Sequence, residues 1–151
     1  MSANLFDSIP EADSKAILLR SRERGQADGT PYAGSIFPDE AWELFRRGDA
    51  KLVDVRTAEE LRDVGAVPNA PNVVWAKPPA MQPNPDFVED LSKVAQSTDT
   101  ILLLCRSSRR SVFAANLLAK TGWTNAFNIL EGFEGTGADG WLARGLPTTL
   151  D

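Results

Sequence analysis

The only cysteine of this chain stands between an apolar run and a cluster of arginines and serines. Residues 101–104, Ile-Leu-Leu-Leu, come directly before Cys105. The six residues that follow it are Arg106, Ser107, Ser108, Arg109, Arg110 and Ser111. This order predicts a buried strand, then a loop, then a helix. Because the first N–H groups of a helix and its dipole favour negative charge, we expect a thiol at this corner to ionise easily and to attract anions.

The residue types at this corner favour nucleophilic chemistry on an anionic substrate. Cys105 is the candidate catalytic residue, because loop N–H groups and guanidinium charge can stabilise a thiolate without a histidine. Guanidinium groups match tetrahedral oxyanions, and serine hydroxyls donate hydrogen bonds to a sulfur or to what it carries. The candidate substrate-binding residues are Arg106, Ser107, Ser108, Arg109, Arg110 and Ser111. An inert, buried Cys105 is the alternative, but a core would not tolerate three arginines beside it.

Composition excludes several classes of protein. With one cysteine and no histidine, the chain can form no internal disulfide, no Cys-His or Ser-His pair and no His-ligated metal site. We expect neither a metal nor a cofactor. The net charge of −5 argues against a nucleic-acid partner. No apolar run approaches the length of a membrane span and the first residues lack a signal-peptide pattern, so we expect a cytoplasmic protein with no membrane partner.

Strand and helix patterns alternate along the chain. Short β-rich runs predict strands at residues 51–56, 72–75, 101–104 and 126–129. Helical spacing predicts helices at residues 11–25, 38–47 and 86–96, another after Thr57, and a last one between the Cys105 loop and Gly122. This alternation predicts an α/β fold with a doubly wound, mainly parallel central sheet of about five strands and helices on both faces. Cys105 would then lie at the carboxyl end of a strand, where such sheets bind ligands.

The length of the chain fits a single domain with an extension before it. Residues 1–35 are predicted to form an N-terminal helix and arm, with a linker containing glycine and proline over residues 26–35. Residues 36–151 are predicted to form the folded domain. Four prolines between residues 77 and 85 predict an exposed, irregular loop.

Three motifs of the chain resemble, in their order, those of the rhodanese sulfurtransferase homology domain. They are LVDVRTAEEL at residues 52–61, GAVPNA at residues 65–70 and CRSSRRS at residues 105–111. Further matches at residues 122–123, 130–133, 141 and 145–147 extend the resemblance, which covers about residues 35–150. The order of the motifs and the Cys-Arg loop together make the resemblance specific.

The resemblance implies a rhodanese-like domain that acts as a thiosulfate sulfurtransferase. Cys105 would accept a sulfane sulfur as a persulfide from a small anionic donor, thiosulfate or a related compound. It would pass this sulfur to cyanide or to a thiol or protein acceptor. Arg106 and Arg110 would help to hold the donor, and backbone N–H groups of residues 106–111 would cradle the persulfide. If the proline-rich loop borders this site, it would help to select the acceptor.

The resemblance also assigns supporting roles outside the Cys105 loop. Asp54 and Arg56 match the first family motif, and we expect Arg56 to pair with Glu60 and so to fix the turn from strand to helix. Thr57 and Glu60 have the spacing of a capping box. Ser108 stands where the family usually has glycine, so a positive φ there would be strained by about 1 kcal/mol.

Two other functions stay open. A cysteine-dependent phosphatase or arsenate reductase uses a similar thiolate bowl, in a loop that is one residue longer. From Cys105 to Arg110 this chain counts six residues inclusively, and the smaller bowl fits one sulfur better than a phosphoryl group. A catalytically silent rhodanese-like binding module would keep the fold without the chemistry, but it would gain nothing from a thiol below three positive charges.

Overall fold

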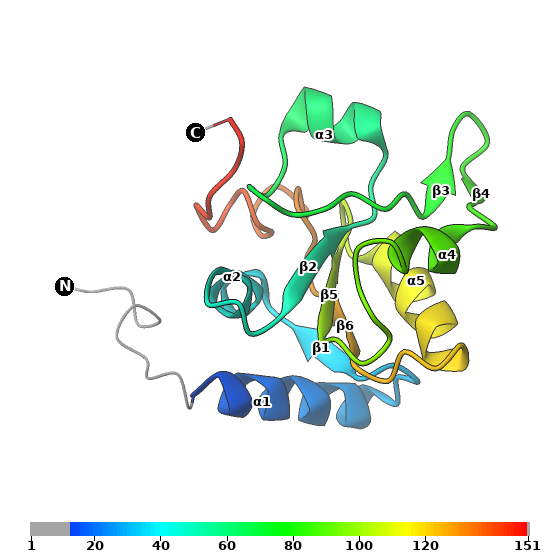
Figure 1. The fold of residues 1–151 in the computed structure, drawn as a ribbon. Helices are drawn as coiled ribbons and strands as arrows, with labels where there is room; N and C mark the ends of the chain where they lie inside the picture. Colours follow the sequence, from blue (N-terminus) through cyan, green and yellow to red (C-terminus); the bar gives the residue numbers. More distant parts are fainter. Residues whose placement is uncertain (1–12, 151) are drawn as a thin grey trace.

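Four short parallel strands form the central sheet of the protein, in the order β1–β6–β5–β2 (Figure 1). They are β1 (Gly34–Ile36), β2 (Lys51–Asp54), β5 (Ile101–Leu104) and β6 (Ala126–Ile129). The computed structural model describes residues 13–150. The predicted α/β fold with a mainly parallel sheet is confirmed, although the sheet has four strands where one more was predicted.

The strand predicted at residues 72–75 is wrong, although this segment runs beside β2. Val73 N donates to Asp54 O at 2.9 Å, and a single bridge pairs Asn72 with Asp54. The side-chain amide of Asn72 donates to the carbonyl oxygens of Asp54 and Arg56, at 2.9 and 2.8 Å. The Asn72 side chain thus takes Arg56 O, which a regular ladder would pair with a backbone N–H, and the chain leaves the sheet.

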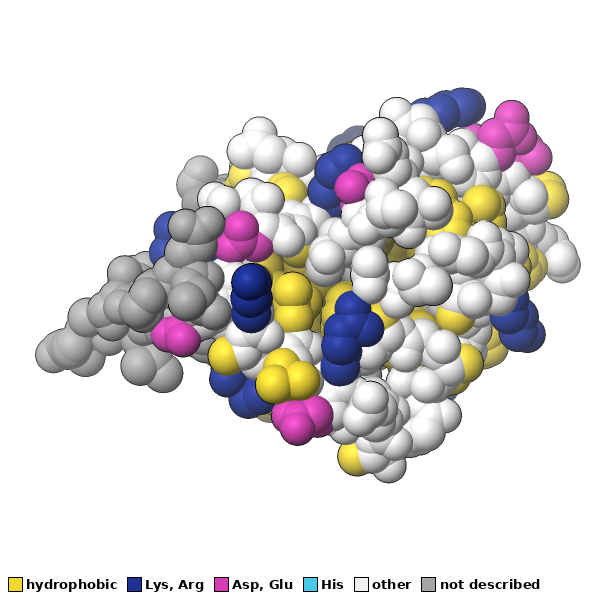
Figure 2. Space-filling model, turned by 60° about the horizontal axis from the view of Figure 1, so that its bottom comes forward, with side chains coloured by type: hydrophobic (Ala, Val, Ile, Leu, Met, Phe, Trp, Pro, Cys, Tyr) yellow, Lys and Arg dark blue, Asp and Glu magenta, His cyan; other side chains and the backbone are white. Residues whose placement is uncertain are grey.

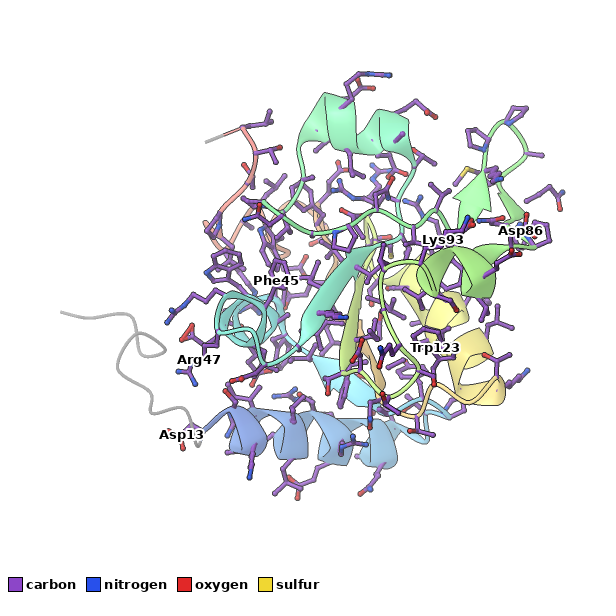
Figure 3. The ribbon with its side chains drawn as sticks, viewed as in Figure 1. Asp13, Phe45, Arg47, Asp86, Lys93 and Trp123 are labelled. Atoms are coloured by element: carbon purple, nitrogen blue, oxygen red, sulfur yellow. The ribbon has the colours of Figure 1, made fainter. Side chains whose placement is uncertain are left out.

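Helices cover the sheet on both faces, which separates two apolar cores. One face carries α1 (Asp13–Asp28) and α2 (Pro38–Arg46), and the other carries α4 (Phe87–Leu91) and α5 (Arg109–Lys120). Along β5, Leu102 and Leu104 join the core of α1 and α2, while the alternate residues join the core of α4 and α5. Phe45 and Trp123, labelled in Figure 3, pack in these two different cores. A parallel strand that is covered by helices on both faces must be apolar throughout, and all four residues of β5 are apolar and buried.

Two smaller elements lie beyond the carboxyl ends of the strands (Figure 1). One is the helix α3 (Ala58–Val64), whose predicted capping box is confirmed: Glu60 N donates to Thr57 Oγ1 at 3.2 Å, and Thr57 N donates to Glu60 Oε1 at 3.1 Å. The other is an antiparallel pair, β3 (Ala76–Lys77) and β4 (Gln82–Pro83). The proline-rich loop predicted to be irregular therefore contains a short hairpin.

Several element boundaries differ from their predictions for local reasons. The first helix continues past Gly25, where it was predicted to end, because Gly25 is buried against the backbone of the sheet; the predicted residues 11 and 12 lie outside the described chain. β2 stops early, since the Asp54 carboxylate accepts from Arg56 N at 3.0 Å and turns the chain. The helix predicted over residues 86–96 shortens to α4, and turns follow it.

The side of the molecule along α1 carries charges of both signs. Figure 2 shows this side, which lies at the bottom of Figure 1, with basic and acidic side chains scattered among small apolar areas. None of the helices formed by residues 13–150 is long and apolar enough to cross a membrane.

β1 joins the N-terminal helix to the sheet. Residues 34–36, which begin inside the predicted linker, form this strand and pair in parallel with β6. Gly34 approaches α1 so closely that a Cβ at this position would lie 2.3 Å from Ser21 O and 2.9 Å from Arg22 N. The docking of α1 therefore depends on the absence of a side chain at residue 34.

We expect Gly34→Ala to lower the free energy of unfolding by about 1–3 kcal/mol, because the added methyl group forces α1 away from β1. Urea unfolding followed by circular dichroism measures this change. An unchanged unfolding midpoint would show that α1 does not depend on this contact.

Candidate active site

Cys105 lies where the central strand β5 turns toward α5. The residue is 1% exposed, and its thiol is free. Residues 106–108 bend the chain, and Ser108 caps the helix with a φ of 74°. The predicted order of strand, loop and helix is confirmed. The left-handed conformation of Ser108, expected from its place in the loop, costs about 1 kcal/mol for a residue with a Cβ.

A glycine-rich turn after β6 holds the Cys105 loop from its other side. Phe133 N donates to Cys105 O at 2.8 Å, and Glu134 N donates to Arg106 O at 3.0 Å. Gly132 has a φ of 80°, and a Cβ there would lie 2.4 Å from Arg106 O. Glycine alone fits both the conformation and the contact, so this turn fixes the path of the loop backbone.

The loop leaves backbone donors that an anion can use. Within the described residues, no N–H of Arg106, Ser107 or Ser108 donates a hydrogen bond to another protein group. The first N–H groups of α5 have no acceptor inside the helix, and the helix dipole adds positive potential at the same end. These donors can stabilise negative charge on the Cys105 sulfur or on an atom bound to it.

The thiol has a hydrogen-bond partner in Ser111, in the first turn of α5. Ser111 Oγ lies 3.2 Å from Cys105 Sγ and donates to Asn128 Oδ1 at 2.5 Å. Asn128 Nδ2 donates in turn to Ser108 Oγ at 2.8 Å. Ser107 is exposed and lies outside this chain of hydrogen bonds. Asn128 was not predicted as a site residue; an amide within an apolar strand was the available signal, because a buried amide needs partners.

The three arginines of the loop differ in their partners. Arg110 is partly buried and donates to both carboxylate oxygens of Glu60, at 2.6 and 2.8 Å. Arg106 is exposed and forms an ion pair with Glu134 at 3.2 Å. Arg109 is exposed and has no ion-pair partner among residues 13–150. Two of the three charges predicted to hold an anion are therefore already paired with carboxylates.

The pair of Glu60 and Arg110 keeps both groups ionised. Burial acts to raise the pKa of Glu60, but hydrogen bonds from Arg110 and from Thr57 outweigh it and lower this pKa to about 2. The hydrogen bond with Glu60 raises the pKa of Arg110. The pair is thus a fixed feature of the wall beside the loop across the neutral pH range.

The expected pair between Arg56 and Glu60 is wrong. Arg56 is fully buried, and its Nε and Nη2 donate to Asp54 at distances from 2.7 to 3.1 Å. Nη2 also donates to Gly65 O at 3.0 Å, and the guanidinium carbon lies 4.1 Å from the centre of the Phe133 ring. A buried guanidinium needs a carboxylate that is buried beside it, and Asp54 meets this need, whereas Glu60 lies on a helix with no buried residue.

The carboxylates around the loop face arginines. Glu60, Glu134 and Asp54 pair with Arg110, Arg106 and Arg56 respectively. No group of three His, Cys, Asp or Glu side chains within residues 13–150 is placed to hold a metal ion. The charged residues near Cys105 are therefore arranged around guanidinium groups, which bind anions.

Two cavities adjoin each other beside the loop. A hollow of about 440 Å³ is lined by Glu60, Val64, Met81, Arg106, Arg110 and Glu134. A more apolar cavity of about 290 Å³ is lined by Trp75, Ala76, Met81, Pro83, Arg109, Arg110 and Phe113. Met81 and Arg110 belong to both, so the proline-rich hairpin borders the mouth of the site.

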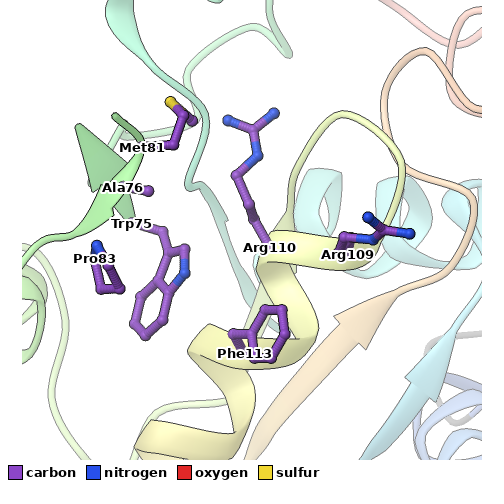
Figure 4. A pocket seen from close by; sticks show the side chains of 7 residues that line it. All are labelled: Trp75, Ala76, Met81, Pro83, Arg109, Arg110 and Phe113. Carbon is purple, nitrogen blue, oxygen red and sulfur yellow. The ribbon is translucent and has the colours of Figure 1, made fainter. Parts of the chain in front are cut away.

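The apolar cavity lies between the hairpin and the first half of α5. Figure 4 shows Trp75 on one wall and Phe113 on the opposite wall, with the Arg110 guanidinium directed past them; Arg109 lines the same cavity at the start of α5. Trp75 packs edge-on against Phe87, with ring centres 5.1 Å apart. Phe113 is 56% exposed, so its ring is available at the opposite wall of the cavity.

The chain is similar to a protein-family model, to curated proteins and to solved structures. The model of the rhodanese-like domain matches residues 37–139. An uncharacterised protein of Rickettsia prowazekii is 42% identical over 107 residues, which are 69% of this chain and 86% of that protein. Thiosulfate sulfurtransferase 16, chloroplastic, of Arabidopsis thaliana is 35% identical over 124 residues, 81% of this chain and 98% of that protein. The crystal structure of Rv0390 from M. tuberculosis superposes with a TM-score of 0.70 and 36% identity, covering 80% of this chain and 99% of that one.

The lowered pKa of Glu60 makes stability depend on pH. This pKa falls from 4.5 to about 2 on folding, so the ionised carboxylate stabilises the protein above about pH 4.5 and loses this effect as the pH falls toward 2. At pH 7 we expect Glu60→Gln to lower the free energy of unfolding by about 1–2 kcal/mol, because the ion pair with Arg110 is lost. The effect is smaller than the pKa shift alone implies, because partial exposure to water screens the pair.

Urea unfolding at pH 7 and at pH 3 measures this difference, which should shrink at the lower pH. Glutamine can keep the capping box through Oε1, but its amide nitrogen cannot accept from Arg110 Nη2, so the change reports on the charge together with this hydrogen bond. The matched control is Glu89→Gln on the exposed side of α4, where no difference is expected at either pH. A constant gap between wild type and Glu60→Gln across this range would contradict the assignment.

Proposed function

Since this chain belongs to the rhodanese-like domain family, we propose that it is a thiosulfate sulfurtransferase in which Cys105 carries the sulfur as a persulfide. The observation that most supports this function is the setting of the thiol, which is buried at the N-terminus of α5 and lies 3.2 Å from the Ser111 hydroxyl. The chain has no histidine to act as a base. Activation by backbone N–H groups, the helix dipole and guanidinium charge is therefore the route open to this thiol.

The proposed reaction has two displacement steps. In the first, the Cys105 thiolate attacks the outer sulfur of thiosulfate; a new S–S bond forms on Cys105, the S–S bond of thiosulfate breaks, and sulfite leaves with the electron pair. In the second, cyanide or a thiolate attacks the terminal sulfur of the persulfide, and the Cys105 thiolate leaves. The products are thiocyanate or a new persulfide, and the cycle needs no external oxidant or reductant.

We propose that the donor binds in the hollow in front of the loop. Arg106 and Arg110 line it, but Glu134 and Glu60 already occupy these guanidinium groups. The two pairs differ in strength, because Arg110 and Glu60 are partly buried and share two hydrogen bonds, while Arg106 is 63% exposed. A doubly charged donor therefore displaces Glu134 from Arg106 more readily than it displaces Glu60 from Arg110.

The acceptor side of the proposal rests on the adjoining apolar cavity. Met81 and Arg110 separate it from the donor hollow. An acceptor thiol attached to an apolar group can place that group between Trp75 and Phe113 and keep its sulfur near the mouth. The same wall gives no advantage to cyanide, which has no apolar part to bury.

Cys105→Ser should abolish sulfur transfer from thiosulfate to cyanide, because a hydroxyl cannot hold the sulfane sulfur. Thiocyanate formation measures the transfer. The mass of the wild-type protein should also increase by one reducible sulfur after treatment with thiosulfate, and the variant should show no such increase. Leu19→Ala, an exposed position on α1, is the control and should behave as wild type.

A wild-type protein that accepts no sulfur from thiosulfate, mercaptopyruvate or a persulfide donor would overturn the proposed function. Turnover of an aryl phosphate in its place would identify a cysteine-dependent phosphatase. A protein inert in all these assays that binds a defined partner would be a silent binding module.

We expect Glu134→Gln to lower the KM for thiosulfate by about two- to fivefold, because an exposed ion pair of modest strength no longer competes with the donor for Arg106. The kcat should change little, since Glu134 does not touch the sulfur. Steady-state kinetics with thiosulfate as the varied substrate measure both constants. Glu89→Gln removes the same charge on α4 and serves as the control; an equal fall in KM in both variants would show a general charge effect.

A further inference from the structure

Asn128 is a buried amide beneath the Cys105 loop, and the reaction steps above do not use it. It lies on the central strand β6 between apolar neighbours and is 2% exposed. Both ends of its amide are occupied: Oδ1 accepts from Ser111 Oγ at 2.5 Å, and Nδ2 donates to Ser108 Oγ at 2.8 Å. An amide is costly to bury in a strand unless such bonds satisfy it.

The hydrogen bonds run in one direction from the sulfur outward. Ser111 has one hydroxyl proton, and it gives this proton to Asn128. Toward Cys105 Sγ, 3.2 Å away, Ser111 then offers only lone pairs. This arrangement suits a neutral thiol, which donates its S–H to Ser111, but it gives no hydroxyl proton to a thiolate or a persulfide anion.

We infer that Asn128 is a positioning residue whose amide turns over when the Cys105 sulfur becomes anionic, which reverses the chain Ser108–Asn128–Ser111–Cys105. A half-turn of the amide exchanges its oxygen and nitrogen. Nδ2 then donates to Ser111 Oγ, Ser111 donates to the sulfur, and Oδ1 accepts from Ser108. Each partner keeps a hydrogen bond in both states. The inference rests on the proposed function, in which the sulfur alternates between these states.

An amide supports both directions of this hydrogen-bond chain, because it carries one acceptor oxygen and one donor nitrogen. A carboxylate in the same place only accepts, so it would hold the Ser111 proton away from the sulfur. Ser108, at the N-cap of α5, affects the hydrogen bonding of the sulfur indirectly, through Asn128. Its left-handed backbone at the N-terminus of α5 brings its hydroxyl to the amide.

Fixed charges also act on the sulfur and must be separated from this effect. The charged groups of the elements around Cys105 are Arg106, Arg109 and Arg110 on the loop and α5, Glu60 on α3, Asp54 at the end of β2, Arg56 after it, and Glu134 on the glycine-rich turn. None of them changes its partner when the amide turns. A test must therefore distinguish the direction of hydrogen bonds from a change of charge.

Alkylation of Cys105 by iodoacetamide, followed across pH, provides this test, because the neutral reagent reacts with the thiolate. Asn128→Asp should raise the pH of half-maximal reactivity by about one unit through loss of a hydrogen bond to a charged sulfur, in addition to the effect of its charge. In a Ser111→Ala background the same substitution should give only the charge effect, so the shift should be clearly smaller. Equal shifts in the two backgrounds would overturn the inference.

Ser111→Ala supplies a second variant that adds no charge and keeps the core amide. It should raise the same pH, because the anionic sulfur loses the hydroxyl that donates to it after the amide turns. If Asn128 held the Ser111 proton in both states, the substitution would remove only an acceptor of the thiol proton and would lower this pH. No rise would therefore overturn the inference even where Asn128→Asp fails to fold.

The alkylation assay uses no sulfur donor, so the two proposals can fail separately. Coupled shifts in a protein that transfers no sulfur would contradict the proposed function alone. Sulfur transfer together with equal shifts would contradict the role of Asn128 alone.

Discussion

A buried ion pair between Asp54 and Arg56 connects the segments that surround the thiol. Asp54 ends β2, and the Arg56 guanidinium reaches the carbonyl of Gly65 after α3 and the ring of Phe133. The backbone N–H of Phe133 then holds the carbonyl of Cys105. A charge buried this deeply needs a counter-charge and hydrogen bonds; Asp54 and Gly65 O supply them to Nε and Nη2, while Nη1 has no partner within the described residues. The pair therefore fixes how β2, α3 and the glycine-rich turn meet at the Cys105 loop.

The site concentrates positive charge in a protein with a net charge of −5. Partly buried Glu60 fixes Arg110 in the wall of the hollow, while exposed Glu134 leaves Arg106 held by a weaker contact. Exposed Arg109 lines the apolar cavity and not the hollow (Figure 4). The three arginines that look equivalent in the sequence thus have different surroundings. Arg110 is held in the wall between the two cavities, Arg106 lines the hollow beside Glu134, and Arg109 lines only the apolar cavity.

The predictable parts of the structure are those that neighbouring residues decide. Apolar runs placed β5 and β6 correctly, and the spacing of Thr57 and Glu60 identified the cap of α3. The left-handed Ser108 agrees with the glycine that the family resemblance places at this position, which neighbouring residues alone did not indicate.

Contacts between distant segments account for the differences between the predicted and the observed structure. Glu60 pairs with Arg110 across fifty positions and not with nearby Arg56. Gly25 continues a helix because it faces Gly34, and the Asn72 side chain takes Arg56 O, an acceptor that a further strand would need. The role of Asn128 depends on two serines that reach it from another element. Patterns within one segment carry no information about such partners.

The contact between Gly132 and Arg106 also limits how this loop can change. A Cβ at residue 132 would lie 2.4 Å from Arg106 O, and the next two N–H groups hold the carbonyls of Cys105 and Arg106. A residue inserted into the loop would carry one of these carbonyls away from its donor and leave a buried backbone group unpaired. Loop length and turn therefore have to change together, so a graft that enlarges the bowl must include residues 132–134 as well as the loop itself.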